Sequence, residues 1–492
     1  MKRIVFKISY GEITFFTVSL VFFLCSAFAQ VCLAQWQPDM RLTNSTGFSE
    51  TSFSNARCIS ANGNYVHAVW FDNRDNNNTG KWEIYYKRST DAGITWDADI
   101  RMTFDTNSWA PSIAVSGSYV HIVWWKMDNP GIYYMRSTNG GISWETAVRL
   151  NVNSCWSPSI AASGSYVHLV YENLSYPAGS EIEYRRSTDD GATWGAVVRL
   201  TNDTVHSSLP SIAVSGSQVH VVWDERDSRN HIYHRHSADG GLTWGAISQL
   251  SENNAFSISA SIAVAGSLVH TVWEDRRNDN SEIYYKRSTD GGATWGVDTR
   301  LTNFAESSQL PSIAVSDNLV HVVWYDWRDA NTEIYYKQSY NGGTNWAPDT
   351  RLTENADISL YPSVAVSGPL VHVIWRDVRD IDAEIYYKRN PTGNIGIQNI
   401  STEIPSSYSL SQNYPNPFNP LTSFEFRVAE SGFVNLTIYD AIGRVVEILQ
   451  NGELQPGIYK ADWDASNYPS GVYFYKLSAG SFTETKKMIL IK

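Results

Sequence analysis

The chain has 492 residues, of which 18% are charged and 13% aromatic, and its formal net charge is −12. This length allows two or three domains with a large apolar core. The acidic balance and the lack of a basic stripe argue against a nucleic-acid partner, because clustered Lys and Arg are needed to neutralise phosphates.

Residues 1–34 have the pattern of an export signal. Basic residues precede the apolar run 13–28, and small residues follow it, so we expect cleavage after Ala29 or after Ala34. A retained membrane anchor is the alternative, but the run is short for a spanning helix and polar sequence follows at once. No second apolar segment is long enough to span a bilayer. We therefore predict a secreted or outer-surface protein without a permanent membrane span.

Two signatures recur between residues 35 and 390. A Val-His strand occurs seven times, beginning at Val66, Val120, Val167, Val219, Val269, Val320 and Val371. A turn of the form Ser-x-Asp-x-Gly-x-Thr-Trp occurs six times, beginning at Ser89, Ser137, Ser187, Ser237, Ser288 and Ser339. The seventh turn is missing after Arg389, where the chain continues into Asn390 and Pro391.

The missing return strand has a counterpart at the other end of the repeats. Residues 36–43 match residues 346–353 almost letter for letter. Each repeat of roughly fifty residues holds four predicted strands, which is typical of a β-propeller blade. An N-terminal strand that completes the last blade would remove the free edge of the array. We predict an all-β fold with a seven-bladed propeller over residues 35–390.

The repeated turn resembles the Asp-box, or BNR repeat, of sialidase-type propellers. In that family the Asp caps backbone amides of the turn and the Trp packs between strands, so the resemblance implies a structural role. The residue types favour such a turn independently of the resemblance, because Asx side chains accept hydrogen bonds from turn N–H groups and glycines adopt positive φ. The structural Asp-box positions are Asp91, Asn139, Asp189, Asp239, Asp290 and Asn341.

The resemblance does not extend to sialidase catalysis. A sialidase would need three arginines for the substrate carboxylate, a Tyr nucleophile with its Glu, and an acidic residue as acid/base. The family's early Phe/Tyr-Arg-Ile/Leu-Pro motif is absent, and residues 56–59 (Ala-Arg-Cys-Ile) depart from it. No catalytic residue is carried over, and the catalytic residues stay unknown.

The recurrent histidines and the two cysteines of the mature chain favour structural roles. Each His lies in the middle of an apolar strand in every repeat, so we expect packed, hydrogen-bonded residues and no metal or other cofactor. Cys58 and Cys155 fall in repeats one and three, which would not be neighbours in a ring. Two buried free thiols are therefore favoured over a disulfide.

An Asp-x-Arg-Asp motif follows the Val-His strand in several repeats. Its arginines could surround the channel mouth and hold an acidic sugar or a peptide. The alternative is a hairpin ion pair, because the next predicted strand begins with Glu83, Glu282, Glu333 or Glu384 in most of these repeats. The arginines are Arg74, Arg226, Arg328 and Arg379, with Arg276 in a variant of the motif.

Repeats two and three lack that motif and would form one irregular sector of the propeller. Aromatic surfaces with a few polar groups suit a sugar ring, and drift of exposed loops is the alternative. The ligand-binding candidates in this sector are Trp125, Lys126, Asp128, Glu172 and Tyr176.

The repeat stops after residue 390. Residues 391–407 read as a linker, and residues 408–492 contain six or seven short strands typical of a small immunoglobulin-like β-sandwich. This segment resembles the C-terminal sorting domain of type IX secretion, through Tyr414-Pro415-Asn416-Pro417, Gly471-Val472-Tyr473 and the terminal Lys-Lys-Met-Ile-Leu. The resemblance implies the type IX machinery as a partner. An accessory adhesion domain is the alternative.

Two functions remain open from the sequence. The first is a secreted or surface-attached propeller that binds an extracellular glycan or protein. The second is an extracellular glycoside hydrolase, sialidase-like, or a polysaccharide lyase. An enzyme requires two nearby carboxylates, at least one in an apolar setting that raises its pKa, whereas a binding module requires only the contact surface.

Overall fold

The structure is a computed structural model, and it describes residues 36–53, 57–75, 81–104, 107–226, 229–252, 254–380, 382–391, 397–401, 404–465 and 468–492. All regular elements in these ranges are β-strands. Within the described residues, no helix is long and apolar enough to cross a membrane.

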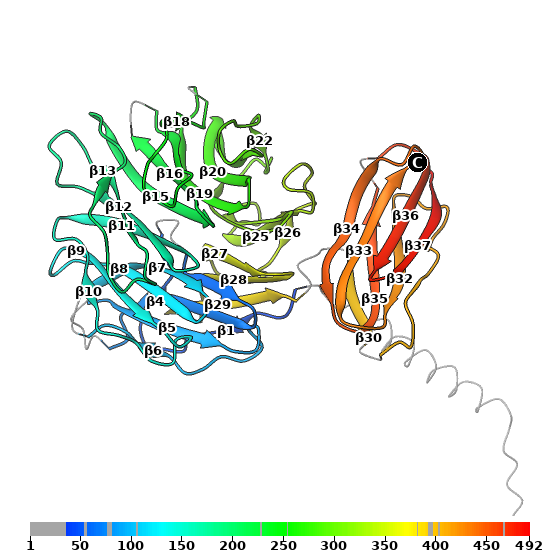
Figure 1. Cartoon of the computed structure of the whole chain (residues 1–492), viewed down its shortest axis with the longest axis horizontal. Helices are drawn as coiled ribbons and strands as arrows, with labels where there is room; N and C mark the ends of the chain where they lie inside the picture. Colours follow the sequence, from blue (N-terminus) through cyan, green and yellow to red (C-terminus); the bar gives the residue numbers. More distant parts are fainter. Residues whose placement is uncertain are drawn as a thin grey trace, which may run out of the picture. The chain divides into compact units, whose positions relative to one another are not determined.

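Residues 36–390 form sheets of four or five strands in chain order, named here sheet 1 to sheet 7. Figure 1 shows these sheets fanning out around a common centre, coloured from blue to yellow. Sheet 1 is β2 (Ser49–Glu50), β3 (Ile59–Asn62), β4 (Tyr65–Asp72), β5 (Glu83–Ser89) and β6 (Ile100–Arg101); sheet 2 is β7 (Ser108–Ser116), β8 (Tyr119–Lys126), β9 (Gly131–Ser137) and β10 (Val148–Arg149); sheet 3 is β11 (Cys155–Ser163), β12 (Tyr166–Asn173), β13 (Glu181–Ser187) and β14 (Val198–Arg199).

The remaining sheets repeat this order. Sheet 4 is β15 (His206–Ser215), β16 (Gln218–Arg226), β17 (His231–Ser237) and β18 (Ser248–Gln249); sheet 5 is β19 (Ser257–Ala265), β20 (Leu268–Asn278), β21 (Asn280–Ser288) and β22 (Thr299–Arg300); sheet 6 is β23 (Ser308–Ser316), β24 (Leu319–Asp326), β25 (Glu333–Ser339) and β26 (Thr350–Arg351); sheet 7 is β27 (Ser359–Ser367), β28 (Leu370–Asp380), β29 (Asp382–Asn390) and β1 (Met40–Arg41). In sheet 7, β1 pairs antiparallel with β29, Met40 facing Tyr387.

Backbone N–H groups link neighbouring sheets near their first strands. In most cases the N–H of an apolar residue donates to the Ser hydroxyl of the preceding sheet, as Ile160 does to Ser112 at 3.3 Å. Sheet 1 is linked in the same way to sheet 7, because Cys58 N–H donates to Ser363 Oγ at 3.1 Å. The other links are Ile113 N–H to Arg57 O, Ile212 to Ser159, Ile262 to Ser211, Ile313 to Ser261 and Val364 to Ser312.

The core between the sheets is aromatic and apolar. The Trp of the second strand is buried in six sheets. In most sheets the His of the second strand is hydrogen-bonded to a Tyr of the third strand, as His67 Nδ1 is to the Tyr86 hydroxyl at 2.7 Å. The Trp that ends each turn packs edge-on against the preceding sheet, as Trp144 does against Tyr86 at 4.9 Å. Cys58 and Cys155 are buried free thiols.

The turn Asp or Asn organises the loop between the third and fourth strands. Asp189 Oδ1 accepts the N–H of Thr193 at 2.8 Å and the hydroxyl of Ser187 at 2.7 Å, and Thr193 donates to Oδ2 at 2.6 Å. These donors hold the pKa of Asp189 down at about 2. Asn139 and Asn341 keep the Oδ1 contacts with the equivalent Ser and backbone N–H.

The C-terminal unit is a β-sandwich of two sheets. One is β30 (Ile397–Ser401), β35 (Gly457–Asp464), β32 (Leu421–Val428) and β31 (Ser409–Leu410); the other is β34 (Val445–Leu454), β33 (Gly432–Asp440), β36 (Gly471–Ala479) and β37 (Phe482–Leu490). Its core is a cluster of buried aliphatic and aromatic side chains, including Phe424, Trp463 and Tyr475.

Candidate functional site

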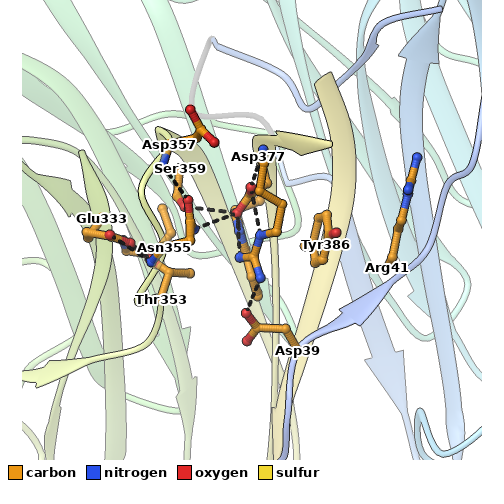
Figure 2. Close-up of polar contacts among 12 residues, drawn as sticks. Asp39, Arg41, Glu333, Thr353, Asn355, Asp357, Ser359, Asp377 and Tyr386 are labelled. Atoms are coloured by element: carbon orange, nitrogen blue, oxygen red, sulfur yellow. Dashed lines mark hydrogen bonds and ion pairs between the residues drawn. The ribbon is translucent and has the colours of Figure 1, made fainter. Parts of the chain in front are cut away.

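Three of the motif arginines lie in structural ion pairs. The guanidinium of Arg379 bridges Asp377 of its own motif at 2.6 Å and Asp39 of the strand-four segment at 2.7 Å, and it stacks over Tyr386 at 4.2 Å. Figure 2 labels the three partners, Asp39, Asp377 and Tyr386. Arg74 joins Asp72 and Asp99, and Arg328 joins Asp326 and Asp349, at 2.6–2.8 Å. Arg277, which sequence reasoning passed over, occupies the same place between Asp275 and Asp298. A guanidinium with two carboxylates and a Tyr ring has little capacity left for a ligand.

The hairpin Glu is not the partner of these arginines, so that pairing expected from the sequence is wrong. Glu282 instead accepts bonds from Thr302 and, at 2.6 Å, from Arg300 of the fourth strand. The start of the third strand lies beside the end of the fourth, and this proximity decides the partner. Glu83, Glu333 and Glu384 are bound in the same way by Thr103 and Arg101, Thr353 and Arg351, and Thr43 and Arg41.

Arg226 and Arg276 lie outside this arrangement. Strand register pairs Trp223 with Tyr233 and Glu225 with His231, so Glu225 takes the place of the motif Asp and Arg226 comes one residue too early. Arg276 occupies the equivalent place in sheet 5, three residues after the strand Trp. Both side chains are solvent-exposed, that of Arg276 by 44%.

The contacts of these two arginines leave them open to a ligand. Arg276 donates to Glu274 at 3.1 Å and to Ser281 at 2.9 Å, and it lies 5.1 Å from the centre of the Phe256 ring. Arg226 makes no hydrogen bond or ion pair within the described residues, although burial raises the pKa of Glu172 and Asp224 and its charge opposes part of that rise. Two neighbouring sheets thus present guanidinium groups whose donors are partly or wholly unused.

The residue that directly follows the strand Trp, or Tyr171 in sheet 3, varies among the sheets, and it was missed in the sequence. In sheets 3, 4 and 5 it is Glu172, Asp224 and Glu274, and all three are buried. Asp224 accepts the N–H of Ser259 at 2.8 Å from the next sheet, and burial raises its pKa to about 7. Burial also raises the pKa of Glu172. The signal that could have located this position is its variation inside an otherwise constant repeat: Phe71, Trp125, Glu172, Asp224, Glu274, Tyr325 and Arg376.

The ligand-binding candidates of repeats two and three make separate contacts. Trp125 is only 7% exposed and stacks at 4.5 Å on Trp156 of the next sheet, so the exposed ring is Trp156, at 39%. Lys126 lies 5.5 Å from the ring of Tyr133, and Asp128 pairs with Lys81 at 3.6 Å.

Tyr176 turns to its own sheet and not to Trp125. Its hydroxyl donates to Glu183 at 2.7 Å, and Arg199 lies 4.0 Å over its ring. The structure thus does not gather the five sector residues around one point.

A hollow formed by side chains between residues 306 and 330 adds an aromatic surface. It has a volume of about 670 Å³ and is lined by Glu306, Ser307, Gln309, Trp327, Arg328 and Ala330. The indole of Trp327 is 45% exposed, and its N–H donates to Gln309 at 3.2 Å. Gln309 in turn donates to Glu274, the partner of Arg276, at 3.3 Å. We name Arg226, Arg276, Phe256 and Trp327 the arginine–aromatic face.

The chemistry of this face suits an anionic sugar. A guanidinium binds carboxylate or sulfate oxygens with paired N–H donors, and an indole stacks on the apolar face of a sugar ring. The described part of the chain contains no group of three His, Cys, Asp or Glu side chains placed to hold a metal ion.

Comparisons with known proteins locate two domain families in the chain. The BNR repeat-like domain matches residues 147–373, and the secretion system C-terminal sorting domain matches residues 412–492. The sorting domain implies export to the outer surface or beyond. No curated protein matches the sequence.

Several solved structures share the fold at low sequence identity. A PL25 ulvan lyase bound to -[GlcA(1-4)Rha3S]- has a TM-score of 0.53 at 11% identity, covering 71% of this chain and 95% of its own. The polysaccharide lyase Uly1 has a TM-score of 0.50 at 9% identity, covering 73% and 100%. PorZ, a surface component of the type IX secretion system of Porphyromonas gingivalis, has a TM-score of 0.43 at 12% identity, covering 90% and 60%. At these identities the likeness to the two lyases shows a propeller-like fold.

Proposed function

We propose that this BNR-repeat, sialidase-like β-propeller protein, which carries a type IX sorting domain, binds an extracellular acidic glycan on its arginine–aromatic face. The observation that carries the proposal is the contrast between two sets of arginines. Arg74, Arg277, Arg328 and Arg379 are each held by at least two carboxylates, whereas Arg226 and Arg276 are exposed and Arg276 lies over the Phe256 ring. Unused guanidinium donors next to exposed rings favour a ligand with both anionic groups and sugar faces.

The architecture that we propose is a closed ring of seven blades. Three observations support it: β1 pairs with β29, Cys58 N–H bonds to Ser363 Oγ, and Trp36 packs on Tyr336 as the turn Trp of a blade. In this arrangement residues 1–34 are the signal peptide, 35–390 the propeller, 391–407 the linker, which contributes β30 to the sandwich, and 408–492 the sorting domain. In the arginine–aromatic face, Arg226 and Arg276 lie near the ends of the second strands of blades 4 and 5, Phe256 directly precedes the first strand of blade 5, and Trp327 follows the second strand of blade 6.

Binding is favoured over hydrolysis by the burial of the carboxylates. Glu172, Asp224 and Glu274 are 8%, 1% and 2% exposed. Asp224 is engaged by backbone N–H groups of sheet 5, and Glu274 by Ser281 and Arg276. A general acid must reach the leaving oxygen at hydrogen-bond distance, which a buried and engaged carboxylate does not do.

The second candidate function is polysaccharide lyase or glycoside hydrolase activity on the same ligand. Its support is the pKa of Asp224, raised to about 7, because a carboxyl group that titrates near neutrality suits proton transfer. The ulvan lyase with the same fold holds a glycan that contains glucuronic acid and sulfate. Acidic polysaccharides are therefore the ligands to test first.

The test is a glycan array probed with the chain from residue 35 onward, with reducing ends and unsaturated products measured in parallel. We expect retention of uronic-acid or sulfated glycans over neutral ones, without product release. Arg226→Gln with Arg276→Gln should reduce retention at least tenfold, since each charged contact contributes about 1.5–3 kcal/mol. The matched control is Arg444→Gln, an exposed arginine of the sorting domain. Equal retention by the double variant and the parent would refute the site, and product release would support the enzyme.

A further inference from the structure

Arg57 breaks the repeat at the innermost strand. At its place the other repeats have Pro111, Pro158, Pro210, Ala260, Pro311 and Pro362, each followed by the Ser that links neighbouring sheets. Sheet 1 has Arg57 followed by Cys58 instead. The substitution puts a long cationic side chain where six repeats have a small apolar residue.

The side chain of Arg57 enters the space enclosed by the first strands. This cavity has a volume of about 150 Å³ and is lined by Arg57, by residues 59–61 and by Ala and Val residues of sheets 4 to 7. The guanidinium crosses it and donates through Nη2 to the carbonyl of Ile262 in sheet 5 at 2.6 Å. The cavity is several times larger than the roughly 30 Å³ that one water occupies in the liquid.

No carboxylate balances this charge in the described part of the chain. The Ile262 carbonyl is the one hydrogen-bond acceptor of the Arg57 side chain there, which leaves most of its five N–H donors unused. Burial without a counter-charge lowers the pKa of Arg57 to about 10. By contrast, the partly buried arginines of the second-strand motif, such as Arg74 and Arg379, each have at least two carboxylates. A largely desolvated guanidinium with one protein acceptor, facing a cavity of this size, favours a counter-ion.

We infer that this half-open cavity is a binding site for a small monovalent anion, such as a halide or formate, held by the Arg57 guanidinium. The anion neutralises a cation on the inner surface shared by sheets 1, 4, 5, 6 and 7, so its binding stabilises the assembled sheets. This site is separate from the arginine–aromatic face and does not depend on the glycan proposal.

Bromide is the probe, because it replaces chloride and scatters anomalously. Crystals of the chain from residue 35 onward, soaked in sodium bromide, should show an anomalous peak in contact with the Arg57 guanidinium. The melting temperature in sodium bromide should exceed that in sodium gluconate at equal ionic strength, since gluconate is a larger and more strongly hydrated anion than bromide. Absence of the peak from the cavity would overturn the inference.

Two variants separate site binding from general salt effects. Arg57→Gln should lose the bromide–gluconate difference in melting temperature. Arg88→Gln should keep it, because Arg88 already pairs with Asp97 at 2.7 Å. An equal difference in all three proteins would contradict a site at Arg57. If Arg57→Gln does not fold, the anomalous peak in the parent protein decides alone.

Discussion

The indole of Trp36 packs edge-on against the ring of Tyr336, with centroids 4.9 Å apart and planes at 78°. Six further pairs have the same geometry, and each joins the turn Trp of one sheet to the preceding sheet: Trp96–Tyr387, Trp144–Tyr86, Trp194–Tyr134, Trp244–Tyr184, Trp295–His234 and Trp346–Tyr285. Trp36 thus supplies, from the N-terminal segment, the ring that the missing seventh turn would have supplied to sheet 7.

Trp36→Ala should destabilise the repeat region strongly. The side chain is 7% exposed, and truncation of a buried Trp costs about 3–5 kcal/mol. Urea unfolding monitored by far-UV circular dichroism measures the change. Trp156→Ala is the matched control, since its ring is 39% exposed and its loss should cost much less. Equal losses in the two variants would mean that Trp36 does not hold the first and last segments together.

His234→Tyr should make the protein more resistant to acid. Sheet 4 has His234 where the other sheets have Tyr, and it lies 3.1 Å from Nδ1 of His220. Burial and the neighbouring histidines hold the pKa of His234 well below 6.5. The unfolded chain therefore takes up a proton first, and stability that is complete above pH 6.5 is lost as the pH falls.

The expected gain at pH 5 is about 2 kcal/mol, because the unfolded-state pKa of His lies some 1.5 units higher. Urea unfolding at pH 7.5 and pH 5.0 gives the comparison. The new Tyr hydroxyl would approach Gly292, as Tyr285 approaches Gly343, so the fold has room for it. The same stability difference between variant and parent at both pH values would exclude His234 as the acid-sensitive group.

Loss of charge should lower the stability of the fold strongly at the paired arginines and only slightly at the exposed ones. Arg379→Gln leaves Asp377 and Asp39 without their cation, and removing one partner of a largely buried pair costs about 3–5 kcal/mol. Arg276→Gln should change stability by about 0.5 kcal/mol or less, because its side chain is 44% exposed. Chemical unfolding of both variants at neutral pH makes the comparison. A large loss from Arg276→Gln would show that this arginine is structural.

The turn carboxylate should be replaceable by Asn but not by Ala. Asp189→Asn keeps the acceptor for Thr193 N–H, as Asn139 and Asn341 do naturally, so the melting temperature should stay within about 2 °C. Asp189→Ala loses three hydrogen bonds and should melt lower. Scanning calorimetry at pH 7 measures both.

The pKa of Asp189 is about 2, so the stabilising effect of this carboxylate is present above pH 3.8 and fades as the pH falls to 2. If Asp189→Asn melts as low as Asp189→Ala at pH 7, the side-chain acceptor is not what stabilises the turn.

Most of the fold could be predicted from the sequence, because its signals are local and repeated. The Val-His strand, the turn and the match of residues 36–43 to 346–353 predict strand type, order and number of repeats without tertiary information. The C-terminal sorting domain was likewise recognisable from its own motifs, and it matches residues 412–492.

What the sequence determined by itself is therefore the repeat and its strands, and what the tertiary structure decided is which side chains are free. Asp224-x-Arg226 has the same spacing as Asp72-x-Arg74, but the pairing of Trp223 with Tyr233 moves Arg226 by one position. Side chains alternate between the two faces of a strand, so a shift of one residue turns a side chain from one face to the other. Arg74 is consequently enclosed between two carboxylates, whereas Arg226 faces solvent. Counted from the strand Trp, Arg74 lies four residues on and Arg226 three, and only the strand pairing shows that the Trp, not the motif Asp, sets the register.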